Sequence, residues 1–243
     1  MKENKYDSDS FFDKYSQMDR SVKGLAGAGE WHELKKALPD FAGKSVLDLG
    51  CGFGWHCRYA AENGAKSVTG VDISQKMLEK AEEINGLPII KYICTPIEDF
   101  AYPQDVFNIV ISSLAIHYLA DFAALTKKIR RTLSTGGAFV FSVEHPTFTA
   151  YGPQKWHCEN GKRLHWPVDR YFDEGPRSAE FLGENVTKYH RTLATYIETL
   201  LENGFEITKV SEPSPTPEAI ENVPEMKDET RRPIFLIVAA RKK

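Results

Sequence analysis

The segment 45–54 constrains what this chain can fold into more than any other stretch of its sequence. It reads Ser-Val-Leu-Asp-Leu-Gly-Cys-Gly-Phe-Gly, so a short apolar run is followed at once by three alternating glycines. Val46, Leu47 and Leu49 suit a strand buried on both faces, whereas glycine permits a positive φ and leaves space where a Cβ would collide with a ligand. Residues 58–62 then read as a helix. A strand, a glycine turn and a helix in this order form the ligand-binding corner of a doubly wound α/β sheet.

The spacing of the glycines distinguishes two kinds of ligand. A dinucleotide-binding fingerprint has the form G-x-G-x-x-G, and its third glycine lies where the helix packs against the strand. Trp55 or Cys57 occupies that third position, depending on whether counting starts from Gly50 or Gly52. The spacing therefore disfavours a nicotinamide-dependent oxidoreductase.

An acidic residue, Asp72, ends the next β-type run. This run covers residues 66–72 and is followed by a helical pattern that contains Met77 and Leu78. An acid at the carboxyl end of the second strand of a βαβ unit can accept hydrogen bonds from both hydroxyls of a ribose. Asp72 is therefore the predicted nucleoside anchor for either kind of ligand.

The acid two positions before the first glycine, followed by G-x-G-x-G, resembles the first motif of the class I S-adenosylmethionine-dependent methyltransferases. Further apolar runs follow at 88–94, 106–112 and 136–143, and residues 95–100 resemble the adenine-contacting segment of that family. The resemblance is strongest over residues 40–145. The resemblance therefore rests on an ordered series of predicted strands as well as on the glycine motif.

The fold that this resemblance implies is of the α/β class. It is a Rossmann-like, doubly wound, seven-stranded and mostly parallel sheet whose antiparallel last strand lies beside the fifth. Residues 205–210 and 234–240 are the predicted sixth and seventh strands, and a helix is predicted over 186–203. We expect a single methyltransferase domain over 1–243.

The resemblance also implies a site for S-adenosylmethionine. The backbone around Gly50 and Gly52 holds the methionine part, Asp48 orients the turn and the amino group, and Asp72 binds the ribose. Ile73 and Ile97 enclose the adenine, while Ser113 and Leu114 flank the reactive methyl group. The predicted cofactor-binding residues are Tyr15, Arg20, Asp48, Gly50, Cys51, Gly52, Asp72, Ile73, Met77, Thr95, Pro96, Ile97, Ser113 and Leu114.

The N-terminal residues 1–40 are predicted to form a helical cap. Residues 11–20 read as a helix rich in aromatic side chains, and three glycines between positions 24 and 29 follow it. One interpretation is a cap that closes over the bound cofactor, so that Tyr15 and Arg20 reach its methionine end. The other is a surface helix that buries two phenylalanines. The sequence favours neither.

Residues 144–189 form the predicted lid insertion after the fifth strand. This stretch loses clear periodicity and gathers several aromatic residues, among them Trp156. So long a connection inside a compact domain is usually a functional lid, and its aromatic load suggests a wall of an organic-substrate pocket. The alternative is an insertion with a small core of its own. The predicted substrate-binding residues are Tyr118, Glu144, Trp156 and His190.

A protein base is needed only if the methyl acceptor arrives protonated. The candidates for that base are His117, Glu144, His145 and His190. We predict His117 and His145 as the catalytic residues, because each follows a predicted strand and an ordinary histidine pKa suits proton transfer near neutrality. For His117, a role in packing or hydrogen bonding is the alternative. A metal site is improbable, since the histidines and cysteines of the insertion show no ligand spacing.

The class of acceptor is narrowed by an absence. Residues 112–118 read Ser-Ser-Leu-Ala-Ile-His-Tyr and lack the Asn/Asp-Pro-Pro-aromatic element of enzymes that methylate nucleic-acid amines or protein amides. They resemble the small-molecule group labelled type 11. A net charge of −3 likewise gives no electrostatic footprint for nucleic acid.

The expected function is therefore methyl transfer from S-adenosylmethionine to a small organic acceptor by in-line displacement, with S-adenosylhomocysteine as product. A noncatalytic S-adenosylmethionine-binding sensor or scaffold is the alternative. The longest apolar run, 234–240, is too short to span a bilayer, and the N-terminus lacks the apolar segment of a signal peptide. We therefore expect a cytoplasmic protein with no membrane partner. The sequence gives no indication of the oligomeric state.

Overall fold

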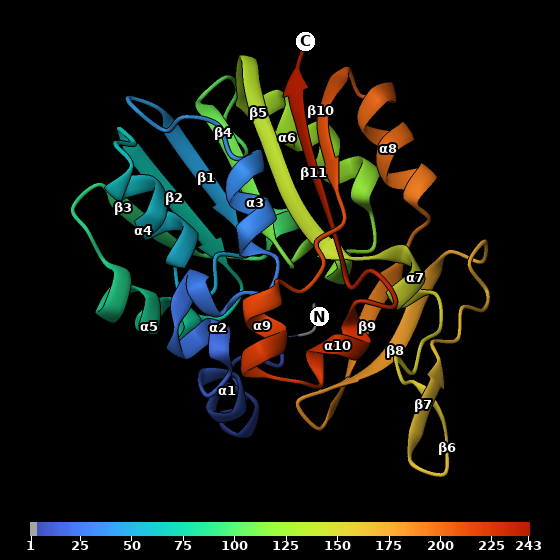
Figure 1. Cartoon of the computed structure of the whole chain (residues 1–243). Coiled ribbons are helices and arrows are strands. Elements are labelled where there is room, and N and C mark those ends of the chain that lie inside the picture. The colour runs from blue at the N-terminus through green and yellow to red at the C-terminus, as the bar shows by residue number, and fades with distance from the viewer. Residues whose placement is uncertain (1–3) are drawn as a thin grey trace.

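The computed structural model describes residues 4–243, and its main sheet has seven strands. In spatial order they are β10 (Phe205–Ser211), β11 (Phe235–Lys242), β5 (Leu133–Glu144), β4 (Phe107–Ser113), β1 (Ser45–Leu49), β2 (Ser67–Asp72) and β3 (Ile90–Cys94) (Figure 1). β11 runs antiparallel to both β5 and β10, and the other neighbours pair in parallel. This confirms the predicted sheet, including the position of its antiparallel last strand.

Helices cover both faces of the sheet (Figure 1). One face carries α3 (Trp31–Ala37), α4 (Trp55–Glu62) and α5 (Gln75–Asn85), and the other carries α6 (Phe122–Thr132) and α8 (Leu193–Glu202). β1 lies in the middle of the sheet, between β2 and β4. Successive side chains of a strand point to opposite faces, and Val46 therefore packs with α4 on one face while Leu47 packs with α6 on the other. Burial on both faces explains why the β1 sequence is almost continuously apolar.

The N-terminal segment lies along the carboxyl ends of the strands. It contains α1 (Asp9–Ser16), α2 (Asp19–Val22) and the 3₁₀ helix η1 (Gly24–Gly27). Phe11 of α1 is fully buried against Ala179 and Val186, which belong to the insertion after β5. The segment therefore joins the sheet edge to that insertion. Residues 1–3 of the predicted cap lie outside the described residues.

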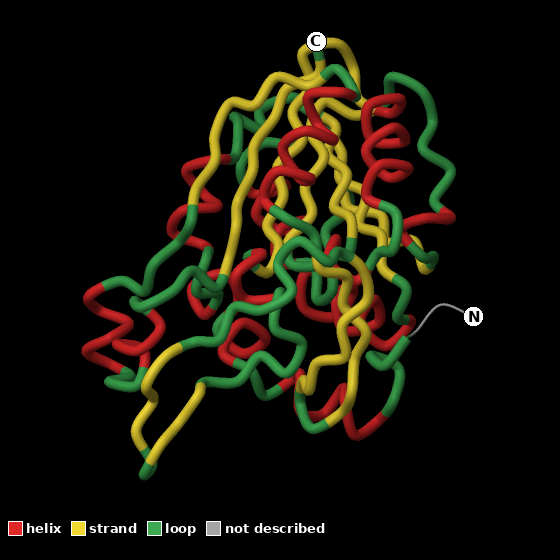
Figure 2. The backbone as a smooth tube through the Cα atoms, turned by 90° about the vertical axis from the view of Figure 1, so that its right-hand side faces the viewer, coloured by secondary structure: helices red, strands yellow, loops and turns green. Residues whose placement is uncertain are grey.

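The insertion after β5 is more regular than its sequence indicates. It holds the short helix α7 (Pro146–Thr149) and two antiparallel hairpins, β6 (His157–Glu159) with β7 (Lys162–His165) and β8 (Gly175–Phe181) with β9 (Glu184–His190). Figure 2 shows the β6–β7 hairpin projecting from the body of the molecule. The inward positions of β8 and β9 include Arg177, Lys188 and His190, all buried. Because these residues are polar, the two-residue periodicity of the strands is absent from the hydrophobic pattern.

The predicted helix over 186–203 is wrong at its beginning. Residues 186–190 are the end of β9, and α8 begins only at Leu193, where the Thr192 side chain caps it by accepting a hydrogen bond from the Thr195 backbone N–H at 3.1 Å. The threonine cap is the local signal that places the true boundary.

The chain between β10 and β11 carries two short helices, α9 (Pro217–Asn222) and α10 (Met226–Glu229). Two further 3₁₀ turns, η2 (Ile97–Asp99) and η3 (Ile116–Tyr118), follow β3 and β4. Within the described part of the chain, no helix has both the length and the apolar character needed to cross a membrane.

Candidate functional site

The glycine turn after β1 brings its backbone close to a neighbouring element at one position and leaves open space at another. Gly50 and Gly52 have φ of 74° and 52°. A Cβ on Gly50 would lie 2.3 Å from the Cβ of Ala115, which is a severe clash. Among residues 4–243, a Cβ on Gly52 would meet only the Tyr15 hydroxyl, at 4.0 Å. Gly50 is thus required for packing, whereas Gly52 leaves an unfilled space beside the backbone.

Asp72 lies directly against this turn. One carboxylate oxygen accepts a hydrogen bond from the Gly52 backbone N–H at 2.8 Å, and the other accepts one from the Ser74 backbone N–H at 3.0 Å. Burial raises the pKa of Asp72, and the two backbone donors oppose that rise. The acid and the glycine turn, twenty residues apart in sequence, therefore form one site.

A cavity of about 950 Å³ lies over the carboxyl ends of the strands. Small-molecule sites usually span about 300 to 1,000 Å³, so this cavity has room for a nucleoside cofactor and a second small molecule. The predicted residues that line it are Tyr15, Arg20, Gly50, Gly52, Asp72, Ile73, Met77, Pro96, Ile97, Ser113, Leu114, His117, Tyr118 and Glu144. The N-terminal segment and the β8–β9 hairpin supply further walls through Tyr6 and Phe181.

One wall near the glycine turn carries a buried ion pair that the sequence analysis did not identify. The Glu30 carboxylate accepts hydrogen bonds from the Arg20 guanidinium at 2.5 Å and from the Ser113 hydroxyl at 3.2 Å. Glu30 is only 1% exposed, and within residues 4–243 its second oxygen has no hydrogen-bond partner. The ion pair with Glu30 raises the pKa of Arg20 although burial lowers it. This wall therefore holds a fixed cation and a carboxylate oxygen able to accept another hydrogen bond.

The half of the cavity near β5 carries three polar side chains in a closed ring. Lys188 donates to Glu144 at 2.6 Å and to Gln154 at 3.0 Å, and Gln154 donates to the other oxygen of Glu144 at 2.7 Å. We call these three residues the polar ring. Burial raises the pKa of Glu144, but its neighbours, Lys188 among them, outweigh that effect and hold the pKa below the ordinary value. Glu144 is a predicted substrate-binding residue, whereas no local pattern in the sequence predicted Gln154 or Lys188.

His117 lines the cavity next to the polar ring. Its Nδ1 accepts a hydrogen bond from the Glu144 backbone N–H at 3.4 Å, which leaves the proton of the neutral imidazole on Nε2. Burial lowers the pKa of His117 to about 4. The imidazole is therefore neutral near pH 7 and is better suited to donating a hydrogen bond than to removing a proton.

Two tyrosines close the cavity from the N-terminal side. Tyr6 and Tyr118 are hydrogen-bonded to each other, and burial raises the pKa of both hydroxyls. The two hydroxyls are therefore uncharged at neutral pH. Together they connect the N-terminal segment to the turn after β4.

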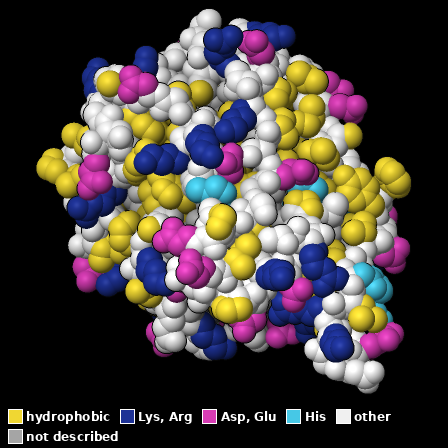
Figure 3. Space-filling view, viewed as in Figure 1, with side chains coloured by type: hydrophobic (Ala, Val, Ile, Leu, Met, Phe, Trp, Pro, Cys, Tyr) yellow, Lys and Arg dark blue, Asp and Glu magenta, His cyan; other side chains and the backbone are white. Residues whose placement is uncertain are grey.

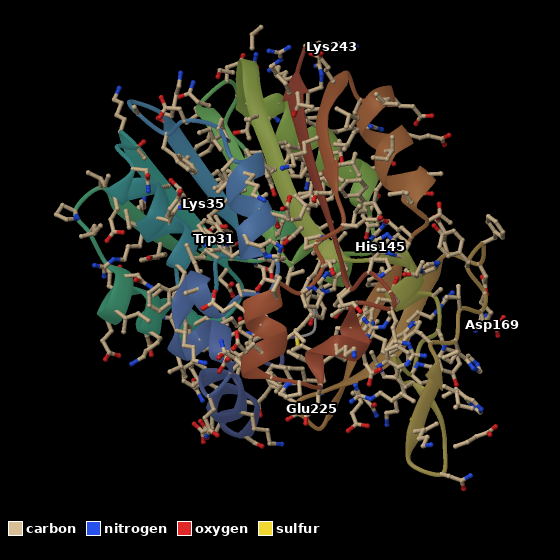
Figure 4. All side chains as sticks on the ribbon, viewed as in Figure 1. Trp31, Lys35, His145, Asp169, Glu225 and Lys243 are labelled. Carbon is tan, nitrogen blue, oxygen red and sulfur yellow. The ribbon has the colours of Figure 1, made fainter. Side chains whose placement is uncertain are left out.

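The structure corrects the placement of three predicted site residues. His145, labelled in Figure 4, caps α7 and forms a hydrogen bond with Glu212 at 2.7 Å. It does not line the cavity. His190 is fully buried between the Thr149 hydroxyl at 2.7 Å and the Tyr171 carbonyl at 2.9 Å. It lies on β9 instead of on a helix. Trp156 is also absent from the cavity wall.

Trp156 instead belongs to an aromatic cluster around a buried arginine. Its ring lies edge-on to Trp166, at 5.4 Å between centroids, and Phe148 stacks on Trp166 at 4.9 Å. The Arg232 guanidinium lies 3.9 Å from the Trp166 ring centre and 5.2 Å from that of Trp156. Only Phe148 of these four residues borders the cavity. The cluster supports the cavity wall from behind.

Three predicted cofactor residues lie behind the turn and do not line the main cavity. Asp48 is buried and accepts a hydrogen bond from the Cys57 thiol at 3.3 Å, and burial raises its pKa to about 7. Cys51 borders a small adjoining pocket of about 60 Å³. Thr95 donates its backbone N–H to the Asp72 carbonyl at 2.8 Å. These residues support the turn and the end of β2 from outside the cavity.

Metal coordination has no geometric basis in residues 4–243, where no three His, Cys, Asp or Glu side chains are grouped as ligands. The rings of His157 and His165 lie 4.8 Å apart across the exposed β6–β7 hairpin, away from the cavity.

Comparison with known proteins is consistent with this site. A family model described as "Methyltransferase domain" matches residues 47–141. A crystal structure of a Listeria monocytogenes protein assigned to the S-adenosylmethionine-dependent methyltransferases is 56% identical, covers 88% of this chain and 98% of its own, and superposes with a TM-score of 0.83. The crystal structure of an S-adenosylmethionine-dependent methyltransferase from Mesorhizobium loti is 44% identical, covers 90% of this chain and 100% of its own, and gives a TM-score of 0.84.

A curated relative extends the comparison to a named reaction. The ubiquinone biosynthesis O-methyltransferase of Mesorhizobium japonicum is 29% identical over 48% of this chain. The match spans 47% of that relative, or about half of its length.

Proposed function

The chain belongs to the S-adenosylmethionine-dependent methyltransferases, and from that premise we propose that it methylates a small organic acceptor bound in the same cavity as the cofactor. The observation that carries this proposal is the division of the cavity into two halves. The glycine turn and Asp72 lie in one half, and the polar ring lies in the other.

The residues of the first half fit S-adenosylmethionine. The space beside Gly52, which a Cβ would fill, admits the close approach of a ligand to the backbone. Asp72 ends β2, where a carboxylate can accept hydrogen bonds from a ribose diol. The Arg20 guanidinium and the unpartnered oxygen of Glu30 offer a cation and an acceptor, which match the carboxylate and ammonium of an amino acid.

We therefore assign the residues as follows. Arg20 and Glu30 hold the methionine end, Gly50 and Gly52 hold the adjoining chain, and Asp72 holds the ribose. Ile73, Met77, Pro96 and Ile97 surround the adenine, and Ser113 and Leu114 lie next to the methyl group, with Tyr15 covering the turn from the N-terminal segment.

The bound cofactor supplies a methyl group that is already electrophilic, because it is attached to a sulfonium. The protein's residues chiefly bind and orient the acceptor and exclude water. His117 suits this role as a neutral hydrogen-bond donor through Nε2. The N-terminal segment and the β8–β9 hairpin enclose the cavity, since Lys14 donates to the Leu182 carbonyl at 3.0 Å across the two elements.

A small acceptor fits the enclosure and the surface better than a nucleic acid does. On the face shown in Figure 3, basic and acidic side chains are interspersed, and no broad basic surface is visible. The chain carries a net charge of −3. Neither feature supplies the positive field that phosphate backbones require.

Two measurements test the proposal. Isothermal titration should show binding of S-adenosylhomocysteine and no binding of NAD. A metabolite extract incubated with methyl-labelled S-adenosylmethionine should then yield a labelled small molecule that is absent without the protein. Labelling of nucleic acid or protein alone would overturn the small-acceptor proposal. Binding of the cofactor without transfer to any acceptor would favour a sensor or scaffold instead.

A further inference from the structure

The polar ring of Glu144, Gln154 and Lys188 lies on the opposite side of the glycine turn from Asp72. β4 and β5 follow β1 in one direction along the sheet, whereas β2 follows it in the other. Adjacent strands are about 4.8 Å apart, so the end of β5 is about 10 Å from the end of β1. This places Glu144 beyond the half of the cavity assigned to the cofactor, with the end of β4 between them.

The polar ring is an unusual feature for a cavity wall. The side chains of Lys188 and Glu144 are only 3% and 14% exposed. Removing two charges from water costs free energy that their mutual attraction recovers only in part, so a buried ion pair rarely stabilises a fold better than apolar packing does. An aromatic ring also lies against this ion pair, since the ring centre of Phe181 is 5.5 Å from the Lys188 ammonium. Since stability does not require the ion pair, ligand recognition is a better explanation for it.

The hydrogen-bonding capacity left in the ring defines the group that it can recognise. The Lys188 ammonium has three N–H donors, of which Glu144 and Gln154 accept two. Each carboxylate oxygen of Glu144 accepts one hydrogen bond from the ring and retains a further lone pair. The ring therefore offers the third N–H of Lys188 and the second N–H of Gln154 beside two free lone pairs of Glu144, and it carries no net charge.

The donors and acceptors of the polar ring favour some polar groups of a ligand over others. A carboxylate placed against Lys188 would also face the negative charge of Glu144, and an ammonium placed against Glu144 would also face Lys188. A hydroxyl avoids both conflicts, because it donates one hydrogen bond and accepts another at a single atom.

We propose that the polar ring binds the head group of the methyl acceptor, and that this acceptor is a hydroxyl-bearing molecule with an aromatic or similarly flat apolar body. The inference rests on the proposed function. The hydroxyl donates to Glu144 and accepts from Lys188, while Phe148, Phe181 and Val186 contact the apolar body.

The methyl transfer needs only the acceptor hydroxyl, the sulfonium of the cofactor, the Glu144 carboxylate and solvent. The hydroxyl oxygen forms a bond to the methyl carbon, and the carbon–sulfur bond breaks with its electron pair left on sulfur. The hydroxyl proton becomes strongly acidic as its oxygen is alkylated, so the Glu144 carboxylate can accept it although it is a weak base. Solvent then takes the proton from Glu144.

Matched probes test which head group the ring selects. Ligand-observed NMR with the protein saturated in S-adenosylhomocysteine would compare 4-methylphenol, 4-methylbenzoate and 4-methylbenzylamine, which share one body. We expect 4-methylphenol to bind best. Stronger binding of the benzoate or the amine, or binding of none of the three, would overturn the inference. Failure to bind S-adenosylhomocysteine at all would instead overturn the proposed function.

Variants of the ring separate recognition from folding. The double variant Glu144→Gln/Lys188→Met removes both charges, so that neither remains buried without its partner. We expect it to keep its melting temperature and its affinity for S-adenosylhomocysteine but to bind 4-methylphenol about tenfold more weakly or worse. The control Lys242→Met breaks the ion pair between Lys242 and Asp105, whose charged atoms are 2.8 Å apart. Neither residue lines the cavity. It should leave 4-methylphenol binding unchanged, and an equal effect of both changes would overturn the role of the ring.

Discussion

The Asp72 carboxylate accepts a hydrogen bond from the backbone N–H of Gly52 at 2.8 Å, so the acid that ends β2 is fixed to the glycine turn that follows β1. Two parallel neighbours in a sheet end at the same edge, and the bond makes their ends a single rigid site. Asp72 therefore has a structural role in the turn as well as its proposed role at the ribose.

Replacement of Asp72 by alanine tests this double role. Asp72→Ala should lower the affinity for S-adenosylhomocysteine by about 1 to 3 kcal/mol, the range for losing hydrogen bonds to a charged group. Isothermal titration measures the effect. The control Glu79→Ala removes an exposed acid from the neighbouring helix α5 and should leave the affinity unchanged. Unchanged affinity in Asp72→Ala would remove this residue from the cofactor site.

The two glycines of the turn should respond differently to a side chain. Gly50→Ala places a Cβ within 2.3 Å of Ala115, so it should destabilise the fold. Gly52→Val directs its atoms into open space, so it should block S-adenosylhomocysteine with a smaller loss of stability, about 1 to 3 kcal/mol from strain at its positive φ. Thermal denaturation and titration together distinguish the two effects. Full cofactor binding by Gly52→Val would show that the ligand lies elsewhere.

Local signals in the sequence were sufficient to predict the cofactor half of the site. A glycine turn after a buried strand and an acid at the end of the next strand are each visible within ten residues, and parallel topology brings them together. The polar ring is different. Lys188 lies on an inward position of β9, between Val186 and His190, and nothing in a pattern of polar residues indicates which side of the strand faces the protein.

Aromatic residues in the insertion were misleading for a related reason. Trp156 was predicted in the substrate wall because aromatic side chains commonly line organic pockets. It packs instead against Arg232, which lies 76 positions later in the chain and supplies a buried cation that no local pattern reveals. Glu30 was missed because its partner Arg20 lies across a turn, so that only the folded chain shows the ion pair.

Because Arg20 and Glu30 are assigned to the amino-acid part of the cofactor, a change in this ion pair should weaken only the ligands that carry that part. Glu30→Gln removes the charge that holds the guanidinium in place, so the affinity for S-adenosylhomocysteine should fall about tenfold or more. Methylthioadenosine lacks the amino and carboxyl groups, and its affinity should not change. A matched control, Glu62→Gln, alters an exposed ion pair with Arg58 on α4. An equal loss for both ligands would indicate a general disturbance of the cavity instead of a contact with the methionine end.

The neutral, buried His117 predicts a dependence of stability on pH. Burial lowers its pKa to about 4 in the folded protein, whereas the unfolded chain has a value of about 6.5. Between these values the unfolded state binds more protons, so the contribution of His117 to stability is complete above about pH 6.5 and is lost as the pH falls toward 4. The loss is on the order of 3 kcal/mol.

The variant His117→Asn isolates this contribution, because it keeps a polar side chain but cannot take up a proton in this range. Urea unfolding at pH 7 and pH 5 should show a smaller loss of stability in the variant than in the wild-type protein. His56, whose pKa burial also lowers to about 4, stays in both proteins and cancels in the comparison. An identical pH dependence in the two proteins would mean that His117 keeps an ordinary pKa in the fold, and it would restore the histidine as a candidate base.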